Sequence, residues 1–178
     1  MRVAIDLDNV VLGWQAHWAH LYNFWFDTNI TDDQLDSWDA CLDLTRFNSM
    51  NEFYAWFEVA GGWETLPYIP GAQGALLALE EAGIPYMFCT SRPIQAHQHT
   101  STWAARQHKA SVDFLNNASK HLAKASVWID DSPEVIANLL AHDKQVIVFD
   151  QPWNRQVDKT VPRAHGWAEA VTLIKEML

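Results

Sequence analysis

Short apolar runs alternate with segments of helical periodicity along most of the chain. Five runs have the length and composition of buried β-strands: residues 2–6, 85–90, 111–116, 126–130 and 145–150. A helical stripe of Ala75, Leu76, Leu79 and Ala82 stops at Gly83, a residue that favours helix ends. Further helices are predicted at residues 96–108, 133–142 and 166–177. Strands that alternate with helices in this way are typical of a parallel sheet covered on both faces, so we predict an α/β fold.

The segment between residues 13 and 65 has a different pattern. It is rich in aromatic and acidic residues, and its apolar positions recur at helical spacing. We therefore predict a small helical insertion at 13–65, with residues 1–12 and 66–178 forming the core. Six of the ten tryptophans lie here: Trp14, Trp18, Trp25, Trp38, Trp56 and Trp63. We expect most of them to fill the interior of a helical bundle, which large aromatic side chains do efficiently.

Length and composition limit the class of protein. A chain of 178 residues suits one domain with a small insertion, and 49% apolar with 19% charged residues excludes disorder. No apolar run reaches the roughly 18 residues of a membrane helix, and the N-terminus lacks a signal-peptide pattern. Two cysteines cannot form a disulfide scaffold. We expect a cytoplasmic protein with no membrane partner.

The charge balance restricts the partners. Twelve basic residues face 22 acidic ones, a formal net charge of -10. Broad binding to a nucleic-acid polymer is disfavoured, because that affinity comes mostly from Lys and Arg neutralising phosphates. A small anionic substrate would need a local positive group or a bound cation.

Polar residues follow the predicted strands where a parallel sheet binds its ligands, at the carboxyl ends. These strand-end residues are Asp6-Leu7-Asp8, Thr90-Ser91-Arg92, Asp130-Asp131 and Asp150, and Lys120 lies in the segment leading to the fourth strand. Each piece has a simpler interpretation as a turn, a helix N-cap or a surface charge, but their common location favours an active site. A cluster of carboxylates is costly unless a cation compensates it, and Mg²⁺ is the usual ion where phosphate is present.

These segments resemble the four motifs of the haloacid dehalogenase-like (HAD) phosphatases over nearly the whole chain: Asp6-Leu7-Asp8-Asn9-Val10, Thr90, Lys120 and Asp130-Asp131. Cys89-Thr90-Ser91, Ile129-Asp130-Asp131 and a lysine ten residues before Asp130 are similar to the 5'(3')-deoxyribonucleotidase branch. The resemblance implies a Rossmann-like parallel sheet with a helical cap inserted after the first strand.

Two residues depart from that branch. Asn9 stands where glycine is usual, but Asn tolerates positive φ well, so we expect the turn to be retained. Arg92 separates Ser91 from Pro93, where the branch often has the proline directly. The substrate is therefore less firmly specified than the phosphatase chemistry.

The resemblance also implies a role for each motif residue. Asp6 would be the nucleophile that forms an aspartyl-phosphate, and Asp8 the acid and base. Mg²⁺ would be bound by Asp6, the backbone carbonyl of Asp8, and Asp130, while Asp131 would orient a metal-bound water or its neighbours. Thr90, Ser91 and Lys120 would bind the phosphate.

A nucleoside monophosphate is the expected substrate, with its base held between aromatic side chains of the insertion. Trp63, just before the return to the core, is the first candidate for base contact, followed by Phe24, Trp38 and Trp56. Three alternatives stay open: a phosphatase for a sugar phosphate or other small metabolite, a polynucleotide 3'-phosphatase, which the charge disfavours, and a binding protein that retains the fold. The oligomeric state and the base preference also stay open.

Overall fold

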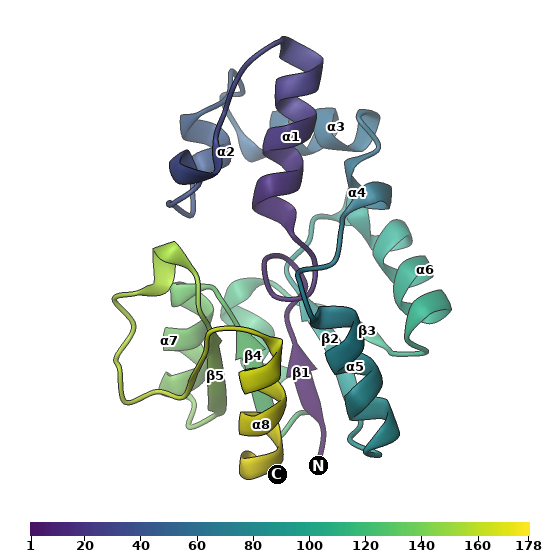
Figure 1. The fold of residues 1–178 in the computed structure, drawn as a ribbon, viewed down its shortest axis with the longest axis vertical. Coiled ribbons are helices and arrows are strands. Elements are labelled where there is room, and N and C mark those ends of the chain that lie inside the picture. Colours follow the sequence, from purple (N-terminus) through teal and green to yellow (C-terminus); the bar gives the residue numbers. More distant parts are fainter.

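A six-stranded sheet forms the centre of the computed structural model, which describes all 178 residues (Figure 1). Its spatial order is β3 (Val112–Phe114), β2 (Tyr86–Thr90), β1 (Val3–Ile5), β4 (Val127–Asp130), β5 (Gln145–Phe149) and β6 (Arg163–Ala164). Every neighbouring pair is parallel, so the predicted α/β fold is confirmed. The two-residue β6 was not predicted, because so short a strand leaves no detectable periodicity.

Side chains of each strand alternate between two apolar layers. Val3 and Ile5 belong to the layer of α5 (Ala72–Glu81) and α8 (Trp167–Met177), and Ala4 belongs to that of α7 (Pro133–Ala141). Helix α6 (His97–Gln107) contacts β3 at one edge of the sheet. Because all neighbouring strands are parallel, the polar residues that follow them gather at one edge of the sheet.

The helical insertion stands beyond the carboxyl ends of the strands (Figure 1). It contains α1 (Trp14–Phe26), η1 (Asp32–Gln34), α2 (Ala40–Asp43), α3 (Met50–Val59) and α4 (Gly62–Thr65). The insertion has its own apolar cluster, in which Trp18, Phe53 and Phe57 are fully buried. This explains most of the aromatic excess in the first third of the chain.

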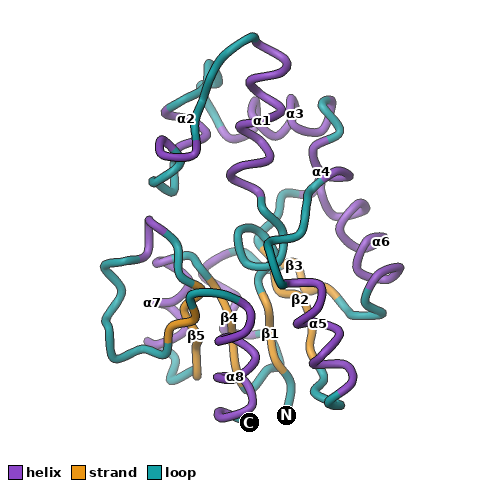
Figure 2. Tube along the Cα trace, in the orientation of Figure 1, coloured by secondary structure: helices purple, strands orange, loops and turns teal.

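The chain leaves and re-enters the α/β part at adjacent points, along the loops of Figure 2. The Gly13 N–H donates to the Pro67 carbonyl at 2.9 Å, and the Ile69 N–H donates to the Val11 carbonyl at 2.8 Å. Three further 3₁₀ turns complete the chain: η2 (Ile94–Ala96), η3 (Asn117–Leu122) and η4 (Pro152–Asn154). None of the helices combines the length and the apolar character needed to cross a membrane.

Candidate active site

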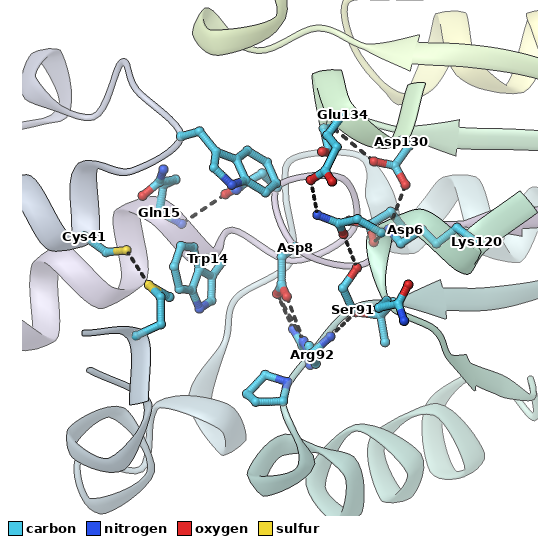
Figure 3. Close-up of a pocket in the computed structure, with 18 of the residues that line it drawn as sticks. Asp6, Asp8, Trp14, Gln15, Cys41, Ser91, Arg92, Lys120, Asp130 and Glu134 are labelled. Atoms are coloured by element: carbon cyan, nitrogen blue, oxygen red, sulfur yellow. Dashed lines mark hydrogen bonds and ion pairs between the residues drawn. The ribbon is translucent and has the colours of Figure 1, made fainter. Parts of the chain in front are cut away.

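A cavity of about 620 Å³ lies between the carboxyl ends of the strands and the helical insertion (Figure 3). The α/β part contributes the predicted residues Asp6, Asp8, Thr90, Ser91, Lys120 and Asp130 to its lining. The insertion contributes four aromatic residues, Trp14, Trp38, Tyr54 and Trp63. One wall is therefore polar and charged, and the opposite wall is largely aromatic.

The loop after β1 directs two aspartates into the cavity. Leu7 is fully buried between them, and its carbonyl accepts hydrogen bonds from the N–H groups of Val10, Val11 and Leu12. Asn9 adopts φ 59°, so this turn keeps the left-handed conformation that usually favours glycine. The Asn9 side chain also accepts a hydrogen bond from the backbone of Gln15 at 3.0 Å, which joins the turn to α1.

Lys120 lies in the centre of the charged wall and is 2% exposed. Its Nζ donates to Asp6 Oδ1 at 2.6 Å and to Asp130 Oδ2 at 2.7 Å. Lys124, four residues further along, is exposed to solvent. Of the two lysines that precede β4, the structure thus brings Lys120 to the carboxylates and leaves Lys124 on the surface.

Three buried aspartates, Asp6, Asp130 and Asp131, offer carboxylate oxygens within 4.8 Å of one another. Burial raises the pKa of Asp6 to about 7, with Lys120 opposing the shift and Asp130 adding to it. Burial also raises the pKa of Asp131 well above its usual range, and the Asp6 charge adds to that shift. One ammonium does not balance three carboxylates, and hard oxygen donors in this number fit a divalent cation such as Mg²⁺.

Asp131 belongs to this trio, whereas the sequence prediction gave it only an orienting role. Its Oδ2 accepts a hydrogen bond from Trp153 Nε1 at 3.1 Å, and its carbonyl accepts one from Asn154 Nδ2 at 2.9 Å. These contacts fix the segment after β4. Neither Asp131 nor Asp150 lines the cavity, and Asp150 pairs with Arg163 at 2.7 Å, away from the carboxylate trio.

The two hydroxyl residues after β2 differ in their surroundings. Thr90 is buried, and its Oγ1 accepts a hydrogen bond from the Arg92 N–H at 3.3 Å. Ser91 is exposed, and its Oγ donates to Asn117, whose Nδ2 donates to Glu134 at 2.9 Å. Both hydroxyls lie at the cavity, but Ser91 must exchange its bond to Asn117 before its hydroxyl can donate to a ligand.

Arg92 is one of the strand-end residues, but the sequence prediction gave it no role at the site. Its side chain points into the protein interior, and the residue as a whole is 6% exposed. The guanidinium donates to both carboxylate oxygens of Asp8 (Figure 3). Nothing local in the sequence indicates this orientation, because Arg92 and Asp8 are 84 positions apart. The only signal was that Arg92 interrupts the expected Ser-Pro succession.

The four predicted base-contact residues fall into two pairs. Trp63 and Trp38 line the cavity; Trp63 is 6% exposed, and Trp38 packs edge-on against Trp153. Phe24 is 81% exposed and Trp56 is buried inside the insertion, and neither lines the cavity. This corrects the expectation for Phe24 and Trp56: helical periodicity identifies an apolar stripe, but not which of its residues face a cavity.

Trp14 and Tyr54 line the cavity and were not among the predicted site residues. Tyr54 packs on Trp63 with ring centroids 5.8 Å apart, so these two side chains form one aromatic surface. The indole N–H groups of Trp14 and Trp63 are buried without an acceptor. Trp56 shares that property away from the cavity, so the unpaired N–H does not by itself mark a ligand contact.

The fold and the aspartate-lysine arrangement define the class of protein as a HAD-like hydrolase. A HAD family hydrolase from Deinococcus radiodurans, solved with bound phosphate and sodium, superposes with a TM-score of 0.68 at 14% identity, covering 99% of this chain and 95% of that one. A haloacid dehalogenase-like hydrolase from Streptococcus pneumoniae gives 0.69 at 13% identity, covering 97% of each chain. At these identities the likeness shows the shared fold.

The sequence comparisons identify a more specific family than the fold alone. The sequence model of the family "5' nucleotidase, deoxy (Pyrimidine), cytosolic type C protein" matches residues 1–177, and the chain belongs to this family. A "Putative 5'(3')-deoxyribonucleotidase" of Chlorobaculum tepidum is 24% identical, with 97% of this chain and 89% of that protein covered. A "Putative nucleotidase" of Oceanobacillus iheyensis is 22% identical, with 94% and 95% covered. The protein is a phosphoric monoester hydrolase of the nucleotidase type, in a superfamily that generally uses a metal ion.

Proposed function

We propose that this hydrolase is a Mg²⁺-dependent phosphomonoesterase that acts on nucleoside monophosphates, in particular 5'(3')-deoxyribonucleotides, through an aspartyl-phosphate at Asp6. The observation that carries the proposal is the position of Asp6. Its carboxylate lies beside the Lys120 ammonium and the two other buried aspartates, at a cavity whose opposite wall is aromatic.

Asp6 supplies the nucleophile. One carboxylate oxygen attacks phosphorus, the bond to the substrate oxygen breaks, and a phosphoryl-aspartate forms. Asp6, the backbone carbonyl of Asp8, and Asp130 would hold Mg²⁺, which offsets the repulsion between a carboxylate and a phosphate dianion. Asp131 is close enough to this group to orient its ligands.

Asp8 is the general acid and base. It gives a proton to the departing alkoxide in the first step and takes one from the hydrolytic water in the second. Lys120 and the hydroxyls of Thr90 and Ser91 stabilise the charge on the phosphoryl oxygens. Lys120 suits this role because it is buried, where an electrostatic interaction is stronger than in water.

Residues 13–65 form the cap that selects the substrate. Trp63, Tyr54, Trp14 and Trp38 come from this segment and line the cavity opposite the carboxylates. A phosphate bound beside Asp6 would leave its organic group among these rings, where a flat nucleobase stacks favourably. The substrate is a small molecule rather than a nucleic-acid polymer, in keeping with the net charge of -10. The free buried thiols of Cys41 and Cys89 support a cytoplasmic location.

A hydrolysis screen tests the substrate class. Deoxyribo- and ribonucleoside 5'- and 3'-monophosphates would be compared with sugar phosphates, each with Mg²⁺ and with a chelator. Nucleoside monophosphates are expected to give the highest kcat/KM, and the chelator is expected to abolish turnover. A sugar phosphate that is hydrolysed more efficiently than every nucleotide would overturn the substrate assignment and leave the phosphatase chemistry intact.

A further inference from the structure

Arg92 forms a two-point ion pair with the Asp8 carboxylate. Its Nε donates to Asp8 Oδ2 at 2.9 Å, and its Nη2 donates to Asp8 Oδ1, so both carboxylate oxygens are held by one planar group (Figure 3). The Arg92 side chain is 2% exposed and the Asp8 side chain is 25% exposed. Arg92 is therefore more deeply buried than Asp8, although both residues line the cavity.

The guanidinium is itself held from two further sides. Its Nη1 donates to Thr100 Oγ1 at 2.9 Å, and Thr100 is buried in α6. Its central carbon lies 5.4 Å from the ring centroid of Trp63, in α4 of the insertion. Arg92 thus joins three separate parts of the chain: the loop after β1, helix α6 and the insertion.

A two-point contact restricts rotation of a carboxylate in a way that a single hydrogen bond does not. A carboxylate has about four lone-pair directions, and the fork of Arg92 occupies two of them. The remaining directions are then fixed relative to the loop that carries Asp6. Lysine has no planar fork and would leave the Asp8 carboxylate free to rotate.

We propose that Arg92 is a positioning residue for the reaction: it fixes the orientation of the Asp8 carboxylate and ties that orientation to the insertion through Trp63. The inference rests on the proposed function, in which Asp8 transfers the proton to the leaving oxygen. A proton donor must lie within hydrogen-bond reach of that oxygen, so an Asp8 that rotates freely donates less often.

Direct binding of substrate phosphate is the competing role for this arginine. Three of its five N–H groups already have acceptors in Asp8 and Thr100, and the Trp63 ring packs against the guanidinium. The two roles differ in kinetics. Loss of a phosphate ligand lowers kcat/KM for every phosphate ester, whereas loss of a positioning residue lowers kcat/KM chiefly for esters whose leaving group needs a proton. The ratio kcat/KM is compared because it reports phosphoryl transfer and not the later hydrolysis of phosphoryl-Asp6, which is the same for every ester.

The test compares thymidine 5'-monophosphate, whose alkoxide must be protonated, with p-nitrophenyl phosphate, whose phenolate leaves without a proton. The variants are Arg92→Gln, Arg92→Lys and Thr100→Val, with Asp8→Asn as reference and the exposed Arg106→Gln as matched control. Arg92→Gln and Arg92→Lys are expected to lower kcat/KM for the nucleotide by about 100-fold, with a much smaller loss of kcat/KM for the phenyl ester. Thr100→Val, which keeps the charge pair, should lower kcat/KM in the same direction by about tenfold or less.

Each outcome decides between named possibilities. An equal loss of kcat/KM on both esters in a fully folded variant would make Arg92 a phosphate ligand and overturn the positioning role. An equal loss on both esters that follows the folded fraction measured by circular dichroism would make it merely structural, and an unchanged or increased kcat/KM for the nucleotide would also overturn the positioning role. If Asp8→Asn itself shows no leaving-group dependence, or if the nucleotide is not a substrate, the proposed function fails. If Asp8→Asn shows the dependence and the Arg92 and Thr100 variants do not, only the role of Arg92 fails.

Discussion

The charged wall of the cavity and its aromatic wall are built in different ways. On the charged wall, each residue follows a strand or precedes one, so the order of the sheet determines its place. On the aromatic wall, the side chains come from helices α1, α3 and α4 of the insertion and from the turn before α2, and only some of the aromatic residues of the insertion face the cavity. The comparison indicates that the chemistry depends on positions which sheet topology specifies, and that substrate choice depends on positions which packing specifies.

The largest effect is expected at the nucleophile on the charged wall. Asp6→Asn keeps the shape of the side chain but cannot form the phosphoryl-enzyme, so turnover should fall to background. Steady-state phosphate release and circular dichroism would be measured together, because the fold is expected to remain. Near-normal phosphatase activity in Asp6→Asn would show that the mechanism is wrong.

A large but smaller effect is expected at Lys120. Lys120→Met removes the one ammonium that contacts Asp6 and Asp130, and the loss of such a group costs about 3 kcal/mol of transition-state stabilisation. Lys124→Met is the matched control, since Lys124 is exposed and its replacement should change kcat/KM little. If Lys124→Met lowers kcat/KM more than Lys120→Met does, the phosphate-binding lysine is Lys124 and the assignment of Lys120 is wrong.

The aromatic wall should respond mainly in KM, with a smaller effect on the chemical step through the contact between Trp63 and Arg92. Trp63→Ala is expected to raise KM for nucleoside monophosphates, since stacking on a base contributes about 1–3 kcal/mol. Phe24→Ala serves as the control, because that side chain is 81% exposed and lies outside the cavity. Kinetics with p-nitrophenyl phosphate should show a smaller change in KM for Trp63→Ala. An equal KM change on both esters would remove Trp63 from the base site.

The smallest effect is on stability and concerns the buried aspartates. Burial raises the pKa of Asp6 from its ordinary value of 3.8 to about 7. Between these two pH values the folded protein therefore binds more protons than the unfolded chain. This contribution to the free energy of unfolding is fully present below that window and falls as pH rises through it. Mg²⁺ binding should restore stability at the upper end, because the ion favours the ionised carboxylates.

The measurement is Tm against pH, with and without Mg²⁺, for the wild type and for Asp6→Asn. Asp6→Asn removes the titrating group, so the difference between the two metal-free curves isolates its contribution. The wild type is expected to lose stability relative to the variant between about pH 4 and pH 7. A difference that stays constant across this range, or a Mg²⁺ effect that is equal at both ends of it, would contradict the assignment.

The sequence by itself determined the parallel α/β fold, and it predicted the insertion after the first strand and the strand-end residues of the charged wall. The physical reason is that parallel strands bring their carboxyl ends to one edge, so residues far apart in sequence meet once the strands are identified. Asp6, Thr90 and Asp130 follow from that rule, and Lys120 follows from the resemblance to the nucleotidases, which have a lysine ten residues before the corresponding aspartate.

Only the tertiary structure decided the rest of the cavity. Trp14 and Trp56 both lie in helices of the insertion, yet Trp14 lines the cavity and Trp56 lies in the interior of the insertion. Arg92 has the sequence environment of an exposed strand-end residue, yet it is buried against Asp8 and Thr100. Periodicity specifies which side of a helix is apolar, but the partner of each side chain depends on how distant elements pack, and that information is not local.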